Sequence, residues 1–187
     1  GVSALLGIRR QSTFEGEASM ALQFAAEKWE KEQLDAGKSP ALAKELYEEL
    51  SRLMDSAKLS TAAGSATKLK KAFDGRFLLP TDGLFAGLLK LRRQGEAPEK
   101  LAYLFHLALA EEILAGCEKA RELSGCSTAA LSGGVFQNLL LLRLVKKLLQ
   151  QAGFTVLQHS LLPPNDGGIC VGQAAYAMYA LQKRAKS

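Results

Sequence analysis

Apolar residues recur at helical spacing along most of this chain, and two short strand-like stretches lie near its C-terminal end. In the segment 139–151 the apolar side chains fall on one broad face: Leu141, Leu142, Leu144, Val145, Leu148 and Leu149. This spacing predicts a helix with one buried face, and Gly153 stands where a C-terminal helix glycine is expected. Residues 128–131 and 154–159 on either side predict two strands, which gives the order strand, helix, strand.

Further helices are predicted before and after this unit. They are a short one over residues 2–8, one that begins near Thr13 and runs towards residue 36, one that begins at Ser39–Pro40, one from Asp82 to Gly95, a long one from Pro98 to about Glu122, and a closing one over 169–183. The stretch 60–65 is the best candidate for a mobile loop. No repeat and no linker divides the chain, so a single domain is expected.

Bulk properties narrow the class of protein. The 187 residues are 48% hydrophobic and 23% charged, which is ordinary for a soluble globular protein. Neither a bilayer-spanning run nor a signal peptide is recognisable, so no membrane association and a cytoplasmic location are expected. Three cysteines without a Cys-x-x-Cys pair suggest neither a zinc knuckle nor a disulfide framework. The net charge of +5 is too small to indicate nucleic-acid binding.

Two polar loops are the candidate site, because each follows one of the two predicted strands. The first contains Gly133, Gly134 and Asn138, and the second is the segment 163–168 with Asp166. Ligands of open α/β sheets bind at the carboxyl ends of the strands. Glycines before a helix let the backbone approach a phosphate, and an exposed aspartate suits a hard cation. This sheet edge is therefore the candidate place for an anion and a cation.

Structural roles remain open for the same residues. The glycine pair can be a plain tight turn, Asn138 can satisfy backbone groups, and Asp166 can cap the final helix. His106 lies next to the apolar face of its predicted helix, where a structural histidine is expected. His159, at a strand end near Asp166, is left open.

The two loops also resemble a known family. The segments 131–138 (LSGGVFQN) and 163–169 (PPNDGGI), with Gly172-Gln-Ala174, resemble the C-terminal end of the HypF family, the carbamoyltransferases of [NiFe]-hydrogenase maturation. The last domain of that family belongs to the Kae/TsaD-like branch of the actin-like ATPase (ASKHA) superfamily. The resemblance implies a helix-rich α/β lobe with a small sheet, in which residues 1–187 are a single fragment, the C-terminal lobe of a Kae/TsaD-like carbamoyltransferase domain. It is weak over residues 28–76.

The resemblance also implies roles for single residues. Gly133, Gly134 and Asn138 would hold phosphate and nucleoside, and Asp166 would ligate a divalent metal, iron or zinc, that bridges to the ligand phosphate. The turn 14–17 (FEGE) matches a ligand-holding turn in which the family usually has tyrosine first. Gly16 and Glu17 are therefore expected as weaker ligand contacts, with ribose hydroxyls as partners of the carboxylate.

The function that the resemblance implies is transfer of a carbamoyl group. The lobe would bind ATP-derived carbamoyl-adenylate and help to pass its carbamoyl group to the C-terminal cysteine of HypE. The other expected partners are an N-terminal lobe, which would share the metal, and a YrdC-like domain of the same protein; the fragment alone is expected to be inactive. The alternatives are a tRNA threonylcarbamoyl transferase or an O-carbamoyltransferase of the same superfamily, or a non-catalytic nucleotide-binding or docking module.

Overall fold

The computed structural model describes residues 1–37, 45, 47–52, 70–71, 77–78 and 81–184. Its helices are α1 (Val2–Leu5), α2 (Glu17–Asp35), α4 (Thr81–Arg93), α5 (Pro98–Ser124), α6 (Leu139–Gln151) and α7 (Ile169–Arg184). Its strands are β1 (Lys70–Lys71), β2 (Phe77–Leu78), β3 (Thr128–Leu131) and β4 (Thr155–Gln158), with 3-10 turns η1 (Gly134–Gln137) and η2 (Asp166–Gly168). The prediction of a helix-rich lobe with a small sheet is confirmed.

The strand–helix–strand unit has the predicted boundaries to within a residue at most ends. Segment 139–151 is α6, and the two predicted strands are β3 and β4. The predicted helix from Ser39 lies largely outside the described residues, although 45 and 47–52 are helical. The predicted loop 60–65 lies wholly outside them.

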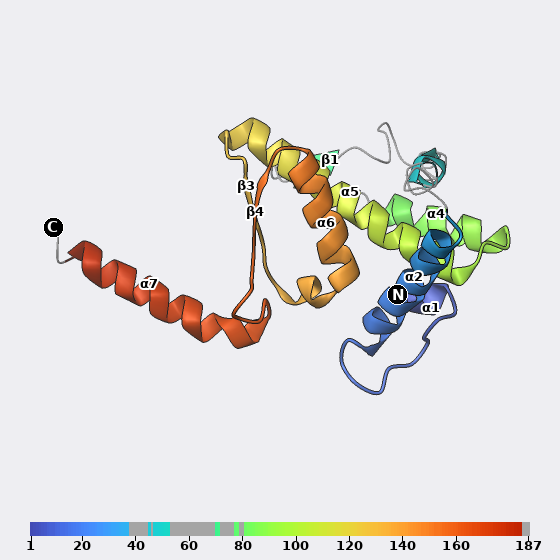
Figure 1. Cartoon of the computed structure of the whole chain (residues 1–187), viewed down its shortest axis with the longest axis horizontal. Helices are drawn as coiled ribbons and strands as arrows, with labels where there is room; N and C mark the ends of the chain where they lie inside the picture. The colour runs from blue at the N-terminus through green and yellow to red at the C-terminus, as the bar shows by residue number, and fades with distance from the viewer. Residues whose placement is uncertain (38–44, 46, 53–69, 72–76, 79–80, 185–187) are drawn as a thin grey trace.

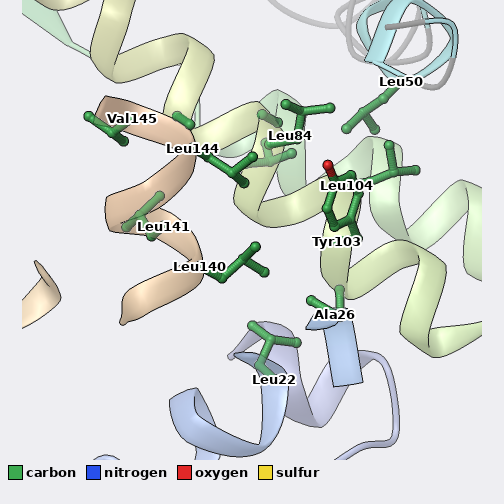
Figure 2. Close-up of a cluster of buried hydrophobic side chains, with 14 of the residues drawn as sticks. Leu22, Ala26, Leu50, Leu84, Tyr103, Leu104, Leu140, Leu141, Leu144 and Val145 are labelled. Atoms are coloured by element: carbon green, nitrogen blue, oxygen red, sulfur yellow. The ribbon is translucent and has the colours of Figure 1, made fainter. Parts of the chain in front are cut away.

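The core is built around α5, the longest helix of the described chain. Helices α2, α4 and α6 pack against it (Figure 1). Leucines supply most of the buried side chains, and Figure 2 shows them converging from these helices. Labelled members of this cluster are Leu22, Ala26, Leu50, Leu84, Tyr103, Leu104, Leu140, Leu141, Leu144 and Val145. Burial of a leucine side chain is worth about 1.5–3 kcal/mol relative to exposure, so this cluster is the main source of stability.

The sheet that matters for the site is parallel. Strand β3 pairs with β4 from Thr128 opposite Thr155 to Leu131 opposite Gln158, and α6 connects the two strands. The carboxyl ends of both strands are therefore level with each other. The loops that begin at Ser132 and His159 leave the same edge of the sheet, as the sequence predicts.

The last helix, α7, lies apart from the other helices (Figure 1). None of its described residues is buried, and it exposes apolar side chains along its length: Ile169, Val171, Tyr176, Met178, Tyr179 and Leu181. Within the described part of the chain, no helix combines the length and apolar character needed to cross a membrane.

Candidate functional site

Two hydrogen bonds tie the polar loops together at the carboxyl edge of the sheet. The backbone N–H of Gly133 donates to the carbonyl of Pro164 at 2.7 Å. The hydroxyl of Ser132 and Nε2 of His159 lie 2.9 Å apart. The structure therefore joins the loop of Gly133 and Gly134 to the loop of Asp166.

The two glycines of the first loop differ in their roles. Gly133 has φ 96 and ψ 160, a conformation nearly restricted to glycine, and its N–H is already bonded to Pro164. Gly134 does not have a left-handed φ, and a Cβ there would meet nothing within 4 Å. As the first residue of η1, Gly134 also has an N–H without an acceptor inside the turn. Gly133 thus shapes the loop, whereas Gly134 is the open backbone position.

Asn138 is the N-cap of α6. Its Oδ1 accepts from the N–H of Leu141 at 3.0 Å, so the capping role left open by the sequence is present. Its Nδ2 lies 2.9 Å from Nε2 of His106. An asparagine amide can form four hydrogen bonds, so one N–H and one Oδ1 lone pair of this half-buried side chain remain for a ligand. The ligand role itself stays a prediction.

His106 is one of the most buried polar residues described, with 1% of its surface exposed. Its Nδ1 lies 2.7 Å from the carbonyl oxygen of Ala102. Burial lowers the pKa of His106 below its usual value of 6.5, against the hydrogen bond to Ala102 and the Glu27 carboxylate on α2, which both raise it. His106 is therefore a buried structural histidine, as expected. Because its pKa is lowered, the ring is neutral near pH 7.

His106 gives a pH dependence of stability with a defined sign. Because its folded-state pKa is lowered, the unfolded chain binds more protons below about pH 6.5, and the free energy of unfolding should fall as the pH decreases. Burial raises the pKa of Glu112 to about 7, which has the opposite effect between pH 7 and 4.5. Urea unfolding at pH 7.5 and 5.5 should therefore be compared between wild type and His106→Gln. The wild type should lose more stability than the variant, by at most about 1.4 kcal/mol per pH unit. An equal change in both would contradict the assignment.

Glu17 is held by its own loop. Its carboxylate accepts from the N–H of Thr13 at 2.6 Å and from the Thr13 hydroxyl at 3.1 Å, and it pairs with Arg9. The backbone bond from Thr13 is the main cause that lowers the pKa of Glu17. The helix predicted to begin near Thr13 begins at Glu17 instead, with Gly16 as its N-cap at φ 86.

Among the described residues, no hydrogen bond joins the turn of Gly16 to the loops that follow β3 and β4. The structure links the loop of Gly133 and Gly134 to the loop of Asp166, and Asn138 follows the first loop as the cap of α6. The ligand contacts of Gly16 and Glu17 stay a prediction.

Asp166 does not cap a helix. The cap of η2 is Asn165, whose Oδ1 accepts from the N–H of Gly167 at 3.1 Å. The Asp166 side chain is exposed and forms no hydrogen bond or ion pair with the described residues. The carboxylate is thus available for a cation, and its oxygen chemistry suits one. A metal site needs more ligands than this one, and the described residues contain no group of three or more His, Cys, Asp and Glu that could hold an ion.

The glycines after Asp166 are required by close packing. A Cβ on Gly168 would lie 2.8 Å from the carbonyl oxygen of Pro163, a distance that forces the loop to move. Since Pro164 accepts from Gly133, we expect Gly168→Ala to weaken the link between the two loops. Hydrogen exchange of the Gly133 amide should become faster, while Gly172→Ala, where a Cβ meets nothing, should leave it unchanged. Unchanged exchange in Gly168→Ala would show that the loop adapts without cost.

Sequence reasoning missed two contacts of the site. Ser132 was not singled out, although it directly follows β3, and the contact between His106 and Asn138 joins residues 32 positions apart. The available signal was a histidine beside the apolar face of a helix. Such a residue, when buried, needs a polar partner from another element.

Comparison with known proteins identifies the family. Residues 1–173 match the family described as "Carbamoyltransferase, Kae1-like Domain, second subdomain". The chain belongs to this family of HypF carbamoyltransferases. The resemblance noted in the sequence is thereby confirmed.

Several curated HypF proteins are similar to the chain. It is 31% identical over 176 residues to carbamoyltransferase HypF2 of Cupriavidus necator, covering 94% of this chain and 21% of the relative. It is 30% identical over 183 residues to HypF of Synechocystis sp., covering 97% and 19%. It is 34% identical over 97 residues to HypF of Rhodobacter capsulatus, covering 52% and 13%. The chain thus spans about a fifth of the length of the HypF relatives that it matches along most of its own length.

Two solved HypF structures share the fold. Full-length HypF in the phosphate- and nucleotide-bound form aligns with a TM-score of 0.69 at 25% identity, over 96% of this chain and 19% of that one. HypF of T. kodakarensis aligns with a TM-score of 0.64 at 26% identity, over 97% and 19%. The helix-rich lobe described above is therefore a known part of HypF proteins.

Proposed function

We propose that this chain is the ligand-binding C-terminal lobe of a longer HypF carbamoyltransferase, called the parent protein below. The parent protein would bind ATP-derived carbamoyl-adenylate and transfer its carbamoyl group to the C-terminal cysteine of HypE. The main support is the joining of the two polar loops through the bond from Gly133 to Pro164, which leaves Gly134 and Asp166 accessible on one edge. Membership in the HypF family supports the type of reaction.

Each residue has a defined task in this proposal. The open backbone at Gly134 lets a phosphate approach, and Gly133 keeps the loop in shape. The free N–H and lone pair of Asn138 face the nucleoside. Asp166 holds one position of a divalent metal, iron or zinc, whose other ligands come from the N-terminal lobe. When bound, the metal neutralises phosphate charge.

Two further residues have weaker tasks. Gly16 and Glu17 would contact the ribose hydroxyls of the ligand. This contact would be weak, because the Glu17 carboxylate is already bonded to Thr13 and Arg9. The YrdC-like domain of the parent protein would supply the adenylate. The lobe itself contributes placement and charge stabilisation.

The proposal requires that the isolated chain is inactive. It supplies one wall of the site, and reacting groups held by one wall are not brought into contact. We expect the chain alone neither to hydrolyse ATP nor to transfer a carbamoyl group to HypE. The parent protein, supplied with ATP and carbamoyl phosphate, should carry out both reactions. The two preparations are assayed side by side, with Asp166→Ala as a control for contaminating activity. Turnover by the chain alone that Asp166→Ala leaves unchanged would contradict the assignment as one lobe.

A second candidate function is a docking module without catalytic chemistry. It is favoured by α7, whose apolar side chains are exposed along the helix. A docking module should bind HypE with the same affinity whether or not adenylate is present. A HypE affinity of the parent protein that depends on ATP and carbamoyl phosphate would favour the transferase.

A further inference from the structure

The core and the candidate site meet at one pair of side chains. His106 comes from the N-terminal half of α5, and Asn138 stands at the start of α6, the helix that packs against α5. Their nearest atoms, His106 Nε2 and Asn138 Nδ2, are 2.9 Å apart. His106 is 1% exposed, whereas Asn138 is half-buried and reaches the outside. A buried ring therefore contacts a residue that is accessible at the site.

Backbone groups at both ends fix the direction of every hydrogen bond in this chain of contacts. The carbonyl of Ala102 can only accept, so Nδ1 of His106 must carry the proton. In a neutral ring, Nε2 is then without a proton and accepts from Nδ2 of Asn138. At the other end, the N–H of Leu141 can only donate, which places Oδ1 of Asn138 towards it. Both ends require the same orientation of the amide.

We propose that His106 is a positioning residue that fixes the amide of Asn138, so that its second N–H and its second lone pair face the nucleoside. This inference rests on the proposed function. If the Asn138 amide formed only its capping bond to Leu141, it could still rotate about that bond. The bond to His106 prevents this rotation, so the second N–H and the second Oδ1 lone pair are already oriented before the ligand binds.

The test uses three variants of the parent protein and ATP as the probe; because the YrdC-like domain also takes ATP, the Kd meant is that of the site that Asn138→Ala disrupts. His106→Leu removes the acceptor, and we expect it to raise the Kd of ATP about tenfold, the size of one well-oriented hydrogen bond. With carbamoyl-adenylate supplied as the substrate, KM should rise while kcat changes little. His106→Gln offers a carbonyl acceptor and should restore most of the affinity. Leu104→Ala, at a buried residue of the same helix, should lower the melting temperature and leave the Kd unchanged.

A double-mutant cycle separates positioning from general destabilisation. In an Asn138→Ala background, His106→Leu should have no further effect on the Kd of ATP, because there is no amide left to orient. The same tenfold loss in that background would overturn the inference. So would an unchanged Kd in the folded His106→Leu protein.

Crystal structures of the ligand-free parent protein test the positioning role of His106 separately from the proposed function. The Asn138 amide should lie towards His106 in the wild type and turn away in His106→Leu. An amide in the same place in both would overturn the positioning role, whatever the affinity for ATP. A wild-type parent protein that binds ATP only at its YrdC-like domain would instead overturn the proposed function.

Discussion

Replacement of Gly134 by valine is expected to abolish nucleotide binding at this lobe of the parent protein, as distinct from its YrdC-like domain, while the fold is retained. The backbone of Gly134 does not have a left-handed φ, and an added Cβ meets no atom within 4 Å, so the folded chain accepts a side chain there. The same open space is where the proposed phosphate approaches the backbone. A β-branched side chain fills it. We expect the Kd of ATP to rise by at least about 100-fold, equivalent to about 2.7 kcal/mol.

Gly133 provides the contrasting variant. At φ 96 any side chain is strained, so Gly133→Ala should lower both the melting temperature and the affinity. Gly134→Val should lower the affinity alone. Calorimetric ATP titrations beside thermal melts of both variants give the comparison. Undiminished affinity in Gly134→Val would mean that the loop is only a structural turn.

The sequence predicts the parts of this fold that depend on local patterns. Helix α6 follows from its apolar face, because four of the six predicted residues are buried: Leu141, Leu144, Val145 and Leu149. Leu142 and Leu148 are only partly buried, and Leu140, which the pattern did not include, is buried instead. Strands β3 and β4 follow from their position on either side of that helix. Their parallel pairing follows from the helix between them, because parallel strands require a crossover connection.

Contacts between distant segments do not follow from such patterns. The link from His106 to Asn138 depends on where α5 crosses α6, and helical spacing gives the face of each helix but not the crossing point. The same holds for the bond from Gly133 to Pro164 across the sheet edge.

Neighbouring residues of similar chemistry are a second limit of sequence reasoning. Asn165 and Asp166 rank almost equally as caps, so the sequence does not decide which of them bonds the backbone. The structure assigns this role to Asn165 and leaves Asp166 open. Likewise, only the backbone angles distinguish the strained Gly133 from the open Gly134.

The assignment of the cap to Asn165 determines what substitutions of Asp166 should do. Neither Asp166→Asn nor Asp166→Ala removes a hydrogen bond of the described chain, so both should keep the melting temperature of the metal-free parent protein. Asp166→Asn retains the shape of the side chain and removes its negative charge, which a divalent metal requires. We therefore expect the parent protein to lose its metal and its carbamoyl transfer activity. The loss should exceed the roughly 10–100-fold effect of removing an outer partner of a metal ligand.

Asn165→Ala is the matched control for Asp166→Asn. It removes the bond from Asn165 to the N–H of Gly167 and should lower stability by about 1 kcal/mol, the usual size of a lost cap, while the carboxylate of Asp166 stays in place. Metal content by elemental analysis, transfer to HypE and thermal melts of the metal-free proteins are measured for both variants. Loss of metal in Asp166→Asn at an unchanged melting temperature, together with retained metal in the less stable Asn165→Ala, would separate metal binding from capping. Full metal occupancy and full activity in Asp166→Asn would refute the role of Asp166 as a metal ligand, because the negative charge that the metal requires is absent from this variant.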